Sequence, residues 1–76
     1  MIQLSKKWTD LLKKSPESGM GYQIVSVILE DGSRIDQVAV VDGVVTKVRG
    51  RKAIPFVDAD IKSVLITHDK WDFASE

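Results

Sequence analysis

The densest group of side chains with reactive chemistry lies near the C-terminus, where His68, Asp69, Lys70 and Asp72 fall close together. An imidazole beside carboxylates can act in acid–base catalysis or help to hold a metal ion. His68 is the only histidine, cysteine is absent, and neither HxH nor HExxH spacing occurs. We therefore interpret this group as the solvated end of a strand and expect no catalytic residue, metal site or cofactor. A small hydrolytic or metal-assisted enzyme centred on His68 is kept as an alternative.

A second pair of carboxylates, Asp58 and Asp60, flanks Ala59. Paired carboxylates can bind a hard cation, but a calcium loop needs a longer run of oxygen ligands and a closing glutamate. The more economical prediction is that Asp58 caps the turn before the last strand.

Basic residues gather at Lys47, Arg49, Arg51 and Lys52, and Arg34 is expected to join them. Such a cluster could contact the phosphates of a nucleic acid. The aromatic side chains that would stack on bases lie elsewhere in the sequence, so charges that protect a sheet edge from pairing are the preferred interpretation. Nucleic-acid binding through these five residues is the alternative.

The aromatic residues Trp71 and Phe73 occupy alternate positions in a C-terminal tail, residues 68–76. Aromatic side chains of this kind anchor a partner at an interface or close over a core. We include both among the candidate partner-binding residues.

The composition limits the classes of protein to consider. The chain has 76 residues, which is enough for a single domain, residues 1–76, with one hydrophobic core. Its 11 basic and 11 acidic residues cancel, so no overall field attracts nucleic acid or a membrane. The absence of cysteine, of a signal peptide and of a long apolar run predicts a cytoplasmic protein.

An amphipathic helix is predicted over about residues 4–14. Its apolar stripe has the spacing i, i+4, i+7, i+8 and consists of Leu4, Trp8, Leu11 and Leu12. Ser5 is the expected N-cap, Asp10 and Lys14 are expected to pair, and Pro16 ends the helix. Residues 15–21 then form a loop rich in turn formers.

Strands are predicted at about 22–30, 33–41, 44–49 and 61–67, with hairpin turns at Asp31–Gly32 and Asp42–Gly43. The predicted fold is therefore α+β: an N-terminal amphipathic helix and a four-stranded antiparallel β-meander. We expect the sheet to be strongly curled or to form a small, partly open SH3-like barrel.

Two-residue loops at both turns define a register. They place Val41 opposite Val44, Val40 opposite Val45, Val38 opposite Lys47, Asp36 opposite Arg49, Ile28 opposite Ile35, Ile24 opposite Ala39 and Val25 opposite Val38. One face then carries Ile24, Ile28, Ile35, Ala39, Val41, Val44 and Val48. The other face carries Val25, Val27, Val38, Val40 and Val45.

Both faces of the predicted sheet are thus apolar, whereas antiparallel sheets commonly show one polar face to water. One short helix covers at most one face of a small sheet. The sequence therefore predicts a small binding or assembly module that acts through its sheet surface, with itself or another protein as partner. The expected partner-binding residues are Val25, Val27, Val38, Val40 and Val45, together with Trp71 and Phe73.

Overall fold

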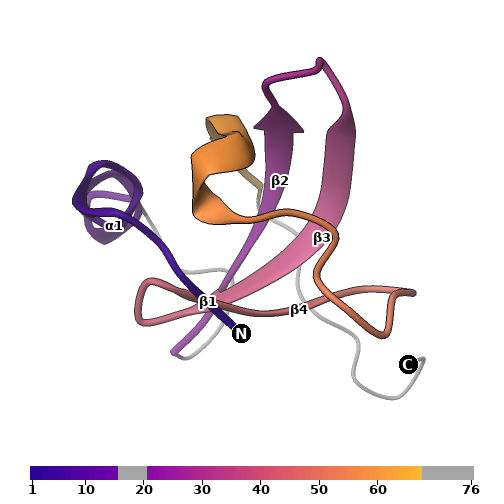
Figure 1. Cartoon of the computed structure of the whole chain (residues 1–76). Coiled ribbons are helices and arrows are strands. Elements are labelled where there is room, and N and C mark those ends of the chain that lie inside the picture. Colours follow the sequence, from indigo (N-terminus) through magenta and orange to yellow (C-terminus); the bar gives the residue numbers. More distant parts are fainter. Residues whose placement is uncertain (16–20, 68–76) are drawn as a thin grey trace.

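The computed structural model describes residues 1–15 and 21–67 (Figure 1). In chain order the elements are β1 (Ile2–Gln3), α1 (Lys6–Lys13), β2 (Gln23–Leu29), β3 (Arg34–Val41), β4 (Val44–Val48), a 3-10 turn η1 (Asp58–Asp60) and β5 (Ile61–Ile66). The strands form one antiparallel sheet with the order β1-β4-β3-β2-β5.

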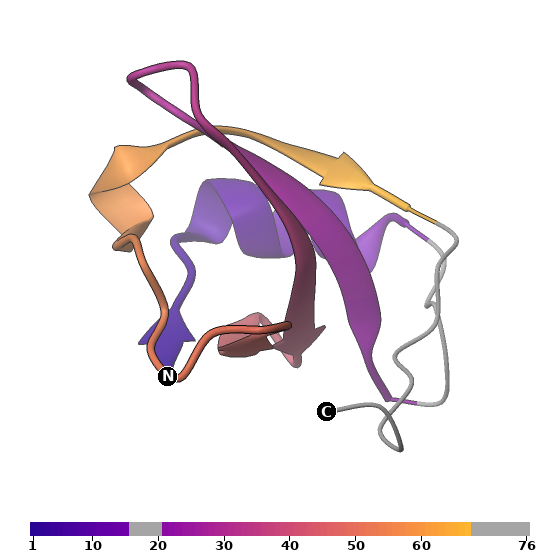
Figure 2. The same cartoon turned by 90° about the vertical axis from the view of Figure 1, so that its right-hand side faces the viewer.

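The sheet is strongly curled, and Figure 2 shows its strands curving around α1. This confirms the predicted α+β fold with an N-terminal helix and a curled antiparallel sheet. The sheet has five strands instead of four, because the two-residue β1 pairs with β4. The last strand, β5, pairs with β2 and not with β4, the strand that precedes it in the sequence. The meander is therefore formed by β2, β3 and β4.

The main core lies between α1 and the concave face of the sheet. Its buried members are Leu4, Trp8, Leu12, Val25, Val27, Val38, Val40, Val45, Val48, Phe56, Ile61 and Val64. Leu11, the other apolar residue of the helix stripe, is 37% exposed. The predicted stripe therefore identifies the buried side of α1 but wrongly includes Leu11.

The prediction that five valines bind a partner is wrong for this fold. Val25, Val27, Val38, Val40 and Val45 are each at most 1% exposed and belong to the main core. The physical reason is that the sheet curls enough for one short helix to cover its concave face. On the convex face, Ile24 and Ala39 form a separate small cluster with the partly buried Tyr22.

A bulge in β3 changes the predicted pairing with β2. Ile24 pairs with Ala39 and Val25 with Val38, as predicted, but Val27 rather than Ile28 pairs with Ile35. The extra residue lies in β3 opposite Ser26, at the point where Gln37 has a φ of 55°. An extra residue in one strand reverses the side to which the following side chains point. Ile35 consequently packs against the main core instead of the convex face.

A second bulge lies in β4. Val41 pairs with Val44 and Val40 with Val45, as predicted, but Val38 pairs with Val48 and Ala39 with Lys47. The extra residue in β4 turns Val48 inward, where it is buried in the main core. Both bulges thus move apolar side chains into the core and leave fewer of them on the convex face.

The turns differ in length. The loop at Asp42–Gly43 has two residues with positive φ, 50° and 77°, as a type I′ hairpin requires. The loop at Asp31–Gly32 is one residue longer than predicted, because the Leu29 N–H donates to the Ser33 carbonyl. The Asp31 carboxylate closes this loop by accepting from the Ser33 N–H at 2.8 Å.

The helix begins after Ser5, the predicted N-cap, but the Ser5 side chain makes no capping hydrogen bond. Instead, the Ser5 N–H donates to the Asp58 carboxylate at 2.9 Å, which ties the start of α1 to η1. The predicted pair of Asp10 with Lys14 is also wrong, because Asp10 pairs with Lys6 at 2.6 Å. Across the described residues, no helix is long and apolar enough to span a membrane.

Candidate functional site

The predicted basic residues are only partly brought together. Lys47, Arg51 and Lys52 line one hollow of about 360 Å³, which β1, the end of β4 and residues 51–57 enclose. The rest of its lining consists of Met1, Ile2, Thr46, Val48, Ala53, Ile54, Phe56 and Val57. We call this the basic hollow. Among the described residues that line it there is no carboxylate, and the cationic side chains lie beside an apolar wall.

The other two predicted basic residues do not line the basic hollow. The Arg49 N–H donates to the Gln37 carbonyl and so continues the pairing of β4 with β3. Arg34 lies at the start of β3, where its guanidinium pairs with Asp36 at 2.7 Å. Asp36 pairs with Arg34 instead of the predicted Arg49, because the bulge in β4 shifts the register between β3 and β4 and places Arg49 beside Gln37.

A small polar network on the convex face joins Arg34, Asp36 and Ser26. The buried Ser26 hydroxyl donates to the Asp36 carboxylate at 2.6 Å, and the same carboxylate oxygen accepts from Arg34. These two hydrogen bonds, the one from Ser26 foremost, hold the pKa of Asp36 below its ordinary value of 3.8. Among the described residues, the hydrogen-bond partners of the Ser26 hydroxyl are Asp36 and Arg34, a pair that forms an ion pair rather than a histidine base.

The pKa shift of Asp36 predicts an acid-sensitive contribution to stability. Because folding lowers this pKa, the contribution is fully present above the ordinary value of 3.8 and is lost as the pH falls through the lower folded value. Replacing Ser26 with alanine should raise the pKa of Asp36 toward its ordinary value, so the variant should lose stability above pH 3.8 and lose less additional stability on acidification than the wild type. An NMR titration of the Asp36 carboxyl group measures the pKa directly. An unchanged pKa in Ser26→Ala would show that this hydrogen bond does not cause the shift.

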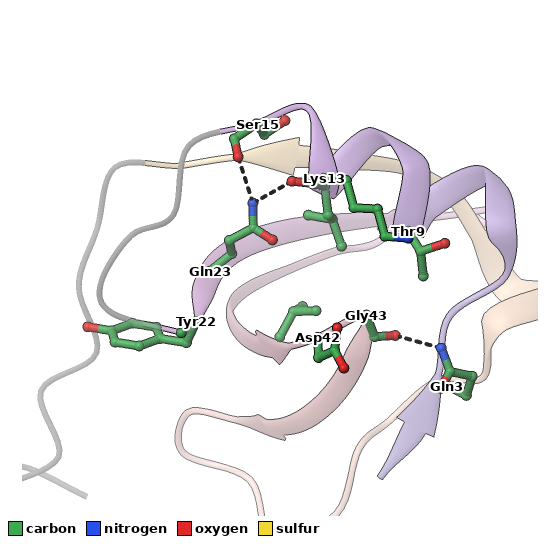
Figure 3. Close-up of a pocket in the computed structure, with 11 residues that line it drawn as sticks. Gln3, Thr9, Lys13, Ser15, Tyr22, Gln23, Asp42 and Gly43 are labelled. Atoms are coloured by element: carbon green, nitrogen blue, oxygen red, sulfur yellow. Dashed lines mark hydrogen bonds between the residues drawn. The ribbon is translucent and has the colours of Figure 1, made fainter.

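A larger hollow of about 600 Å³ lies between α1 and the β3–β4 turn (Figure 3). Its polar side chains hold the fold together. Gln23 donates to the Leu12 carbonyl at 2.9 Å and to the Ser15 carbonyl at 3.3 Å, and Gln3 donates to the Gly43 carbonyl at 3.2 Å. The titratable residues among the described ones that line it are Lys13, Tyr22 and Asp42, which do not make a nucleophile and base.

No catalytic or metal-binding arrangement is found within residues 1–15 and 21–67. No group of three histidine, cysteine or acidic residues there could hold a metal ion. Asp58 binds the Ser5 N–H, and it is Asp60 that accepts from the Val57 N–H at 3.2 Å within the turn before β5. The capping role was therefore predicted for the wrong one of these two aspartates.

Several predicted site residues lie outside the described residues. They are His68, Asp69 and Asp72 of the alternative enzyme site, and Trp71 and Phe73 of the partner-binding set. The structure therefore does not bear on these predictions.

One edge of the sheet is a further candidate surface. β5 is the last strand in the sheet order, and none of the described strands pairs with its outer side. The Thr67 N–H and hydroxyl both donate to the Ile24 carbonyl. Because main-chain groups alternate along an antiparallel ladder, those of Val64 and Ile66 point to the outer side. Leu65, on the convex face beside this edge, is 40% exposed.

Comparison with known proteins gives no further assignment, because no family model, curated protein or solved structure matches this chain. The candidate sites therefore rest on their geometry alone.

The sequence correctly predicted that Lys47, Arg51 and Lys52 lie together, because they are near neighbours in the chain. The apolar wall of the hollow was not predicted, because Ile2, Ile54 and Val57 come from separate segments that show no regular apolar periodicity. The free edge of β5 was also missed. Only the observed pairing of β5 with β2 reveals it.

Proposed function

We propose that this protein is a small cytoplasmic assembly module that forms a homodimer by pairing the outer edges of two β5 strands. The observation that carries the proposal is the position of β5, a six-residue strand at the end of the sheet. The opposite edge strand, β1, has only two residues and offers little to a partner. The absence of cysteine fits the reducing environment of the cytoplasm.

The composition of β5 supports pairing at this edge. Natural proteins protect edge strands with charges, proline or bulges, because unpaired main-chain groups recruit other strands. The sequence of β5 is IKSVLI, in which Lys62 is the single charged residue and proline is absent. The one irregularity of its pairing with β2 lies at its N-terminal end, which leaves Ser63 to Ile66 regular. This part of the edge is therefore open to strand addition.

A second copy is the partner that fits this strand best. Antiparallel pairing around a two-fold axis at Val64 would join the outward main-chain groups of Val64 in both copies. It would place Leu65 opposite Ser63 of the second copy, and Ile66 opposite Lys62. No like charges face each other in this register, and each exposed leucine gains a neighbour on the convex face.

Charge-swap variants test this register. Two lysines, introduced as Ser63→Lys with Leu65→Lys, would face one another across the two-fold axis and oppose dimer formation. Two glutamates, introduced as Ser63→Glu with Leu65→Glu, would have the same effect. We expect a dimeric wild-type protein by light scattering, two monomeric variants, and a dimer when the variants are mixed in equal amounts.

The mixing step separates a lost interface from a damaged fold, because a misfolded chain is not rescued by its partner. Circular dichroism confirms that each variant is folded. Val41→Lys is the matched control, since Val41 is 41% exposed but lies in β3, away from the β5 edge. A wild-type protein that is monomeric at high micromolar concentration would refute the proposal. So would dimeric variants, or a mixture that remains monomeric.

A further inference from the structure

The basic hollow combines two features that a binding site needs. Its polar side is formed by Lys47, Arg51 and Lys52, all exposed, and its apolar side includes Ile54 and Val57. Val57 is 56% exposed, so an aliphatic surface is available next to the charges. The volume of about 360 Å³ lies near the lower end of the range for ligand pockets.

The positive charge of the hollow is not neutralised at two of its cations. The ion pairs among the described residues are Lys6 with Asp10 and Arg34 with Asp36, and neither involves Arg51 or Lys52. Because the whole chain has a net charge of zero, this is a local field rather than a general one. A ligand with negative charge therefore has a specific place to bind.

We infer that the basic hollow binds an acidic peptide segment of a partner protein, with an aliphatic side chain of that peptide against Val57 and Ile54. Flanking carboxylates of the peptide would meet Arg51 and Lys52, and the arginine fork can hold one carboxylate through two hydrogen bonds. This inference does not depend on the proposed dimer, because no residue of β5 lines the hollow.

An acidic peptide fits these observations better than a nucleic acid does. Proteins that bind single strands stack bases on exposed aromatic rings, but Phe56, the aromatic residue among the described ones that line the hollow, is only 4% exposed. A nucleic-acid backbone also needs a row of cations along its length, whereas Lys47, Arg51 and Lys52 line a single hollow. A backbone phosphate would also make no apolar contact with the aliphatic wall of the hollow.

Fluorescence anisotropy with a short labelled peptide, in which a central leucine is flanked by glutamates, tests the inference. We expect saturable binding that weakens as the salt concentration rises. The double variant Arg51→Gln with Lys52→Gln should weaken binding about fivefold. The matched double variant Lys13→Gln with Lys14→Gln removes the same charge from α1 and its C-cap, and it should bind like the wild type.

The aliphatic contact has its own test. Val57→Ser should weaken binding of the leucine peptide but leave unchanged the binding of a peptide with serine at the central position. Labelled oligothymidylate is the nucleic-acid probe. The inference is refuted if the leucine peptide does not bind, if oligothymidylate binds more tightly, or if both double variants weaken binding equally.

Discussion

Replacing Trp8 with alanine is expected to lower the free energy of unfolding by about 3–5 kcal/mol, the usual cost of removing a buried large aromatic side chain. Trp8 is 7% exposed and packs with Leu4 and Leu12 into the concave face of the sheet. The loss would be a large fraction of the total stability of many small domains, so the variant should unfold at a much lower urea concentration than the wild type. Urea denaturation followed by circular dichroism measures the change.

The control for this prediction is Leu11→Ala in the same helix. Leu11 is 37% exposed, so its removal should change the free energy of unfolding by no more than about 1 kcal/mol. An α-helix of eight residues is not stable alone in water, and α1 therefore depends on its packing. If Trp8→Ala and Leu11→Ala had equal effects, the orientation of α1 against the sheet would be wrong.

The sequence predicted this helix well because its signal is local. Leu4, Trp8 and Leu12 repeat at four-residue intervals, and the same residues are buried in the structure. The turn at Asp42–Gly43 and the two strand pairs next to it were predicted correctly for the same reason, since two adjacent residues determine a type I′ turn. Local signals thus located the helix and the reversals of the chain.

The faces of the sheet could not be predicted beyond the first bulge. A bulge changes the side to which each later residue points. No feature of the sequence near Gln37 or Thr46 indicates a bulge there. Ile35 and Val48 were placed with the convex residues, yet both pack into the main core. Fewer apolar side chains therefore lie on the convex face than the alternating pattern indicated.

The partner-binding valines illustrate how curvature changes an inference. A flat sheet of this size would leave part of a valine-rich face in water. In the curled sheet all five valines are buried in the main core. The proposed interface consequently moves from a face to the edge of β5, which depends on strand order and not on side-chain pattern.

Replacing Gly43 with alanine is the second change with a large expected effect, about 2–3 kcal/mol of lost stability. Gly43 has a φ of 77°, a conformation that costs other residues about 1–2 kcal/mol. A methyl group there would also lie 2.7 Å from the Thr9 Cγ2 atom of α1, closer than packed carbons approach. Thermal and urea denaturation both measure the loss.

Two further variants separate the backbone term from the contact with the helix. Gly32→Ala has a similar φ of 90° but no atom within 4 Å of the added methyl, so it should show the backbone cost alone. Thr9→Ser removes the clashing Cγ2 atom and retains a hydroxyl that can donate to the Lys6 carbonyl. Gly43→Ala should therefore cost less in the Thr9→Ser background than in the wild type. If the cost is the same in both backgrounds, α1 does not lie against the β3–β4 turn.

The contact between Thr9 and Gly43 also bears on how the helix is placed over the sheet. The Leu4 N–H donates to the Gly43 carbonyl at 2.9 Å, so the same glycine binds the segment that leads into α1. A side chain at position 43 would push on the helix where this hydrogen bond holds its start. Because Leu4 and Trp8 belong to that part of the core, such a displacement should loosen both, and the Gly43→Ala and Trp8→Ala effects should be less than additive when combined.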